Sequence, residues 1–130
     1  MDNKENITWK DIKYFSKKEF ECKDGSRACK MNMHFVKRLD EIREEFGKMI
    51  ITSGYRTPSW NLKIGGVPNS AHTKGLAADV LCETSSKRFK LVKIAIEKGI
   101  RRIGIGKDFI HLDMDRSKPW RTMWTYYKKK

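Results

Sequence analysis

The feature that most limits how this chain can fold is an aspartate inside an apolar run, LAADVLC, at residues 76–82. Short apolar runs bounded by turn residues are typical of buried strands. Alternation along such a strand places Ala77, Asp79 and Leu81 on one face. A carboxylate at this position is explained either by a structural hydrogen bond or by a metal ion.

A second run, FIHLDM at residues 109–114, provides a partner for this carboxylate. Its alternation predicts that the apolar residues face the core, while His111 and Asp113 share the opposite face. If the two runs are neighbouring strands, Asp79 and His111 converge. His72 lies in the glycine-bearing loop just before the first run and can fold over the same point.

Two imidazoles and one carboxylate make a three-ligand set. Catalytic zinc sites typically have three protein ligands of these types and leave a fourth position for water. Carboxylate and imidazole also suit iron and manganese, so zinc is a preference from ligand chemistry. From spacing alone, a structural hydrogen bond between histidine and aspartate remains the alternative.

The remaining pattern predicts helices over residues 32–46 and 85–99, with Phe89, Val92 and Ile96 of the second helix facing inward. Two prolines, two glycines and two asparagines predict a loop over residues 57–70. This order indicates an α+β fold with a largely antiparallel sheet and two main helices. The expected strands are residues 48–56, 76–82, 101–106, 109–114 and 121–127.

The length of 130 residues fits a single domain. Within it, we expect residues 1–19 to form an N-terminal extension and residues 128–130 to form a flexible basic tail. No CxxC motif is present, so the three cysteines are expected to be reduced thiols. Cys82 is expected in the core, and a disulfide between Cys22 and Cys29 remains an alternative.

The charge is strongly basic, with 29 lysines and arginines against 16 acidic residues and a formal net charge of +13. Such a charge favours polyanionic partners, among them nucleic acid, acidic lipid and anionic cell-wall polymer. We expect no nucleic-acid binding, because the lysines are scattered and do not form a basic stripe with stacking aromatics. No stretch has the roughly 18 apolar residues of a membrane span. The polar start MDNKENITWKD lacks the pattern of a secretory signal, so we expect synthesis in the cytoplasm.

Three motifs in order resemble the zinc D-Ala-D-Ala carboxypeptidase family and its phage endolysin relatives, which share the hedgehog/DD-peptidase fold. They are SGYR at residues 53–56, NSAHTKGLAADV at residues 69–80 and FIHLD at residues 109–113. The family pattern S-x-H-x-x-G-x-A-x-D is matched without a gap from Ser70 to Asp79. A later acidic-x-x-His pattern is matched by Asp108 and His111. The resemblance covers roughly Phe20 to the end of the chain.

The resemblance implies that one zinc ion per chain is held by His72, Asp79 and His111. It also implies that Asp108 is the general base, where many relatives have glutamate, and that Arg56 binds a substrate carbonyl or carboxylate. From the sequence, Asp108 could instead be a turn residue, and Arg56 could tie down the turn that follows it. Further candidates are Asp113 and Ser70 behind the ligands. Tyr55, Trp120, Trp124 and Tyr126 are candidates along a substrate cleft, and core packing is the favoured alternative for the last three.

The implied activity is hydrolysis of peptide bonds in peptidoglycan stem peptides, either as a D-Ala-D-Ala carboxypeptidase or as an L-Ala-D-Glu endopeptidase. A phage or prophage lytic enzyme is the expected setting, acting on the cell wall after release or within a phage particle. The expected partners are peptidoglycan peptides and anionic cell-wall polymer, and the expected state is a monomer. The alternative is a zinc-containing cell-wall-binding module of the same fold without catalysis.

Overall fold

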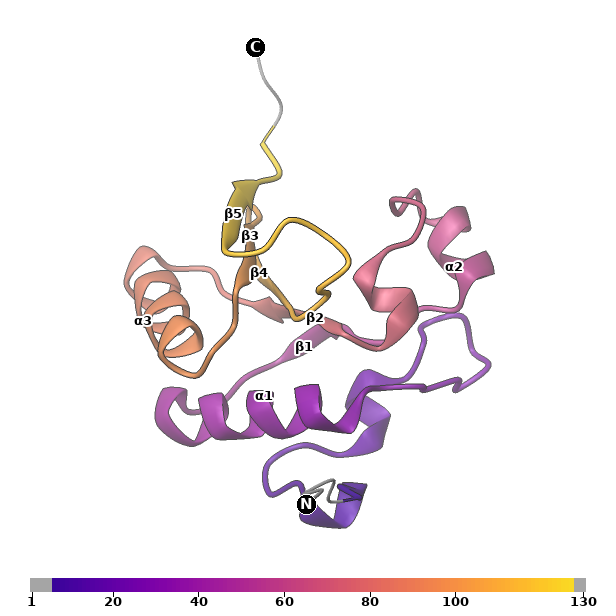
Figure 1. The fold of residues 1–130 in the computed structure, drawn as a ribbon, viewed down its shortest axis with the longest axis horizontal. Helices are drawn as coiled ribbons and strands as arrows, with labels where there is room; N and C mark the ends of the chain where they lie inside the picture. The colour runs from indigo at the N-terminus through magenta and orange to yellow at the C-terminus, as the bar shows by residue number, and fades with distance from the viewer. Residues whose placement is uncertain (1–5, 128–130) are drawn as a thin grey trace.

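A computed structural model of the chain describes residues 6–127, which form one five-stranded sheet flanked by helices (Figure 1). The strands are β1 (Ile51–Ser53), β2 (Ala77–Leu81), β3 (Arg102–Ile105), β4 (Phe109–Asp113) and β5 (Thr122–Thr125). Their order across the sheet is β1-β2-β4-β3-β5, and among these pairs β3 with β5 is parallel. The largely antiparallel α+β fold predicted from the sequence is therefore confirmed.

The helices lie around this sheet, with α1 below it in Figure 1, α3 at the left and α2 at the right. The α-helices are α1 (Met33–Phe46), α2 (Pro58–Lys63) and α3 (Ser85–Glu97). Short 3-10 helices are η1 (Trp9–Asp11), η2 (Lys17–Phe20) and η3 (Ala71–Lys74). The two long helices are the two that the sequence predicted.

The hydrophobic core lies between one face of the sheet, α1 and α3. From the sheet it takes side chains such as Val80, Ile110 and Leu112, which are fully buried against Leu39 of α1 and Leu91 of α3. These strand residues alternate with the polar ones, so burial of the apolar set leaves the polar set on the opposite face. That opposite face carries the candidate ligands.

Two details of the helices differ from the sequence prediction. Residues 57–70 are not all loop, because Thr57 caps α2 through its hydroxyl and Pro58 occupies the first turn. In α3 the prediction of inward Phe89 and Ile96 is wrong, since these side chains are 73% and 46% exposed. The buried stripe of α3 instead includes Leu91, which lies two residues and about 200° around the helix from Phe89.

The register of the sheet aligns two rows of residues across the polar face. In one row Asp79 of β2 lies opposite His111 of β4, which in turn lies opposite Gly104 of β3. Trp124 of β5 extends this row beside Gly104. In the next row Asp113 pairs with Arg102 of β3. The antiparallel pairing of β2 with β4 therefore brings together residues that are 32 positions apart.

The N-terminal segment of the chain contributes to the core. Ile12 and Phe15, from the predicted N-terminal extension, are buried in the core cluster. The predicted basic tail, residues 128–130, lies outside the described residues, so the domain boundaries stay a prediction.

Cys22, Cys29 and Cys82 are free thiols, and Cys82 lies in the core. None of the helices between residues 6 and 127 is long and apolar enough to cross a membrane.

Candidate metal centre

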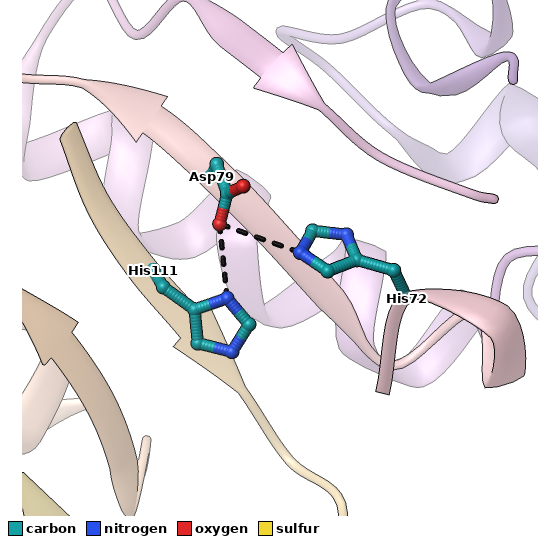
Figure 2. A group of neighbouring side chains, drawn as sticks. All are labelled: His72, Asp79 and His111. Atoms are coloured by element: carbon teal, nitrogen blue, oxygen red, sulfur yellow. Dashed lines mark hydrogen bonds and ion pairs between the residues drawn. The ribbon is translucent and has the colours of Figure 1, made fainter. Parts of the chain in front are cut away.

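Three elements bring His72, Asp79 and His111 together on the polar face of the sheet (Figure 2). His72 comes from η3, Asp79 from β2 and His111 from β4. Oδ1 of Asp79 lies 3.4 Å from Nε2 of His72 and 2.9 Å from Nδ1 of His111. One ligand atom from each residue lies within 4.8 Å of the other two, so the group can hold a single metal ion.

The second nitrogen of each imidazole has a partner that fixes its tautomer. His72 Nδ1 lies 2.8 Å from the backbone carbonyl oxygen of Gly54, which can only accept, so this nitrogen donates and Nε2 keeps its lone pair. His111 Nε2 donates to Asp113 Oδ2 at 2.6 Å, so Nδ1 keeps its lone pair. In the neutral rings both lone pairs therefore face the Asp79 carboxylate, whereas in a protonated ring the same nitrogen donates to that carboxylate. Metal-binding histidines show this arrangement, with the other nitrogen donating to a carbonyl or carboxylate.

The backbone around η3 explains how His72 reaches this point. The hydroxyl of Ser70 accepts a hydrogen bond from the backbone N–H of His72 at 3.2 Å and begins the 3-10 turn. Gly75 ends the turn in the left-handed region, at φ +70°. A Cβ at this glycine would lie 2.0 Å from the carbonyl oxygen of Lys30. Only glycine therefore permits the tight connection between His72 and β2.

The electrostatics of the three residues are strongly coupled. Burial alone would raise the pKa of the Asp79 carboxyl, but hydrogen bonds from His111 and His72 outweigh burial and hold the pKa well below its ordinary value. Burial alone would lower the pKa of His111, but hydrogen bonds to Asp113 and Asp79 raise it. Asp79 is therefore ionised near neutral pH, as a metal ligand must be.

Arg56 lies beside the ligands as a fixed cation. Its Nη2 is 3.7 Å from Asp79 Oδ2, while Nε donates to the Ser53 hydroxyl at 3.2 Å and Nη1 donates to Asn61 Oδ1 at 3.1 Å. Asn61 itself donates to the carbonyl oxygen of Val67 at 2.8 Å. Asn61 was not among the predicted site residues, because it stands in the segment predicted as a loop.

The three ligands and Arg56 line a cleft of about 560 Å³. Residues 64–67 contribute to its lining, as do the aromatic rings of Phe109, Trp124 and Tyr126. The Trp124 ring lies 5.5 Å from the His111 ring, measured between centroids. A Cβ at Gly104 would be 2.8 Å from Trp124 Nε1, so this glycine lets the indole lie across β3 toward the site. Trp124 and Tyr126, for which the sequence left both core packing and a place along the cleft open, lie in the cleft lining, and their contact with substrate stays a prediction.

The structure does not bring every predicted residue into the cleft. Asp108 is exposed and lies in the turn between β3 and β4, outside the lining residues. Tyr55 is buried and Trp120 packs under the guanidinium of Arg116, and neither lines the cleft. In contrast, Arg102 and Lys118 do line it, although neither was predicted from the sequence. Arg102 could have been found from the register of the predicted pair of strands, which places it opposite Asp113.

A comparison with protein-family models matches residues 13–113 to the family described as Peptidase M15. The chain belongs to the peptidase M15 family. The family resemblance expected from the sequence is thus confirmed, and this M15 domain is a metallopeptidase, a class of hydrolase. M15 peptidases depend on zinc, and His72, Asp79 and His111 form a group that can bind such an ion. In a sequence comparison, no curated protein matches the chain.

Proposed function

We propose that this M15 peptidase holds one zinc ion per chain on His72, Asp79 and His111 and hydrolyses peptide bonds in peptidoglycan stem peptides. One observation carries the proposal. Two imidazole lone pairs and a carboxylate oxygen converge within 4.8 Å at the wall of an open cleft, next to a fixed guanidinium. A set of three ligands facing a cleft leaves room for water or substrate, as catalytic zinc sites require.

In the proposed hydrolysis the metal ligands and Arg56 have separate roles. His72, Asp79 and His111 would hold the zinc ion, which would supply an activated water and polarise the scissile carbonyl. Arg56 contributes a positive charge that is held in place by Ser53 and Asn61, so little reorganisation is needed when negative charge develops on the carbonyl oxygen. The same guanidinium suits a substrate carboxylate, because its planar fork donates two parallel hydrogen bonds.

The proton acceptor in this proposal is Asp108. Asp113 is a poor candidate, because one of its oxygens accepts from His111 and the other from Arg102. Asp108 lies three residues before His111 and is exposed, so its carboxylate is free to turn toward the cleft when substrate binds. Catalytic hydrogen bonds are often long without substrate and shorten only in the reacting complex.

We further propose a D-Ala-D-Ala carboxypeptidase or L-Ala-D-Glu endopeptidase specificity and a phage or prophage lytic role. The protein would then act on the cell wall after release, or from within a phage particle. The net charge of +13 supports this setting, because cell walls rich in anionic polymer attract a basic protein. We propose that it acts as a monomer.

Digestion of purified peptidoglycan tests the proposal. We expect the zinc-loaded protein to release stem-peptide fragments, and mass spectrometry of these fragments identifies the bond that is cut. Chelation should abolish the release, and added zinc should restore it. The apo protein should keep its circular dichroism spectrum, because the core does not include the ligands. A metal-free protein that still cleaves muropeptides would contradict the metal assignment.

A zinc-containing cell-wall-binding module is the second candidate, and the exposed position of Asp108 outside the cleft favours it. In that case the protein would hold zinc and bind peptidoglycan fragments without releasing products. The digestion experiment separates the two candidates. Fragment binding by a zinc-loaded protein that shows no turnover on any stem peptide would establish the binding module.

A further inference from the structure

Arg102 is a buried cation on the polar face of the sheet, beneath the candidate metal centre. It is 8% exposed, and its guanidinium is held by three groups. Nε donates to Asp113 Oδ1 at 2.8 Å, and Nη1 donates to the backbone carbonyl oxygen of Pro119 at 2.6 Å. The guanidinium also lies over the Trp124 ring, 4.8 Å from its centroid. These contacts leave the guanidinium a single orientation.

Asp113 connects this guanidinium to the ligand His111. Its Oδ1 accepts from Arg102 and from the backbone N–H of Asp115 at 3.0 Å, while Oδ2 accepts from His111 Nε2. The Asp113 side chain is 1% exposed, so water cannot take the place of these donors. The carboxylate can therefore rotate only if a buried hydrogen bond is lost, and a buried polar group left without a partner is unfavourable.

A contribution to stability does not by itself explain why the Arg102–Asp113 ion pair is buried. A buried ion pair can often be replaced by apolar side chains of similar volume with little loss of stability. An apolar pair in this row of the sheet would, however, leave His111 Nε2 without an acceptor. The position of the pair, one residue row from the ligands, suggests that it serves the metal centre.

We propose that Arg102 is a positioning residue that acts through Asp113 to fix the ring of His111 with Nδ1 free toward the metal. Arg102 makes no direct contact with the ligand atoms; its effect on the metal is indirect. Loss of the guanidinium leaves Asp113 Oδ1 held by the Asp115 N–H. The carboxylate is then oriented less firmly, and it fixes the tautomer and orientation of the His111 ring less well. The proposal rests on the metal centre of the proposed function, but it does not depend on the substrate or on catalysis.

Zinc affinity measured by competition with a chromophoric chelator tests the proposal. Arg102→Met removes the guanidinium and keeps much of the side-chain length. We expect zinc to bind this variant about 10–100-fold more weakly than the wild type, the usual effect of losing a group behind a metal ligand. Arg102→Lys keeps a charge, but an ammonium cannot donate to both Asp113 and Pro119 as a planar fork does. Its zinc affinity should therefore lie between those of the wild type and Arg102→Met.

Arg101→Met is the matched control. The Arg101 side chain donates to the carbonyl oxygens of Ile96 and Ile100 and lies outside the cleft lining, so zinc affinity should not change. Circular dichroism and the melting temperature of each apo protein check the fold. Wild-type zinc affinity in folded Arg102→Met would overturn the proposal. If that variant does not fold, Asp113→Asn decides in its place, since wild-type affinity there would equally overturn it.

A double-mutant cycle distinguishes action through Asp113 from an independent effect. If Arg102 acts through Asp113, the double variant Arg102→Met/Asp113→Asn should bind zinc about as weakly as Asp113→Asn alone. Losses that multiply in the double variant would refute the connection. The wild type serves as the reference for the metal centre itself. A wild type that binds no zinc would refute that centre, whereas normal wild-type binding with no effect of Arg102→Met refutes only the role of Arg102.

Discussion

At the scale of single residues, Asp108 is the residue whose proposed role as general base agrees least with its position in the fold. Asp108 and His111 are three positions apart, and in a regular strand an odd separation places side chains on opposite faces. In the structure β4 begins only at Phe109, so Asp108 lies in the preceding turn and strand alternation does not set its direction. A side chain in a turn can change direction without disturbing the sheet, so a catalytic role requires only a local movement.

Substitution of Asp108 tests that role. Asp108→Asn keeps the size of the side chain but removes the proton acceptor, so turnover on stem peptides should fall by roughly 10²–10⁴, the usual effect of losing a positioned acid–base group. Zinc content should not change, because the three ligands are untouched. His111→Ala should instead lose both zinc and activity. Near-normal turnover of zinc-loaded Asp108→Asn would make Asp108 a turn residue only.

At the scale of elements, the segment between β4 and β5 is tied to η3 across the cleft. In Figure 1 this segment arches toward η3 and α2. Asp115 is its anchor, with its carboxylate 3.0 Å from Nζ of Lys74 and 2.6 Å from Nζ of Lys118. Ser117 adds a hydroxyl donor at 2.6 Å. Lys118 also donates to the carbonyl oxygen of Asn69, so the anchor reaches the loop before His72.

The stability contributed by this anchor should depend on pH. Burial alone would raise the pKa of Asp115, but hydrogen bonds from Lys118, Ser117 and Lys74 outweigh burial and hold the pKa well below its ordinary value. A carboxyl whose pKa is lowered by folding stabilises the protein above its unfolded-state pKa of about 3.9, and this contribution is lost as the pH falls below that value. The effect should therefore be complete at neutral pH and diminished in acid.

Asp115→Asn measures the contribution. We expect the free energy of unfolding at pH 7 to fall by about 1.5–3 kcal/mol, the scale of hydrogen bonds to a charged group. The difference between wild type and variant, measured by urea denaturation, should shrink as the pH falls below about 3.9. Asp108→Asn is the control, because within residues 6–127 the Asp108 carboxylate makes no ion pair or hydrogen bond. A difference that is the same at both pH values would show that the ionised carboxylate is not the anchor.

At the scale of the whole molecule, the excess of basic residues, 29 against 16 acidic ones, should govern the proposed attachment to the cell wall. Salt screens exposed charges over about 10 Å at 0.1 M and about 3 Å at 1 M. Pull-down of the protein on purified walls should therefore weaken steadily across that range of salt. Walls stripped of their anionic polymers are the control and should retain little protein even at low salt. Attachment that does not weaken with salt would mean that charge is not its cause.

Strand periodicity and motif spacing were enough to predict the ligand types and the strand faces on which the ligands lie. Strand periodicity placed Asp79 apart from the core residues of its own strand, and it placed His111 and Asp113 together on one face. These properties are local, because alternation along a strand depends only on backbone geometry. The resemblance of the motifs to a known family added the assignment of a peptidase, and the match of residues 13–113 to the Peptidase M15 family confirms it.

Most of the residues that surround the ligands could be identified only in the folded chain. The partners of the histidines are the Gly54 carbonyl and the Asp113 carboxylate, and the first of these comes from a segment 18 positions away. Arg102 reaches Asp113 because β3 and β4 pair in one particular register, and Asn61 reaches Arg56 because α2 forms within a segment that the sequence predicted as loop. Such contacts depend on strand register and on the packing of distant segments. Local patterns in the sequence give at most the register of a hairpin with a short turn, and they carry no information about the packing of distant segments.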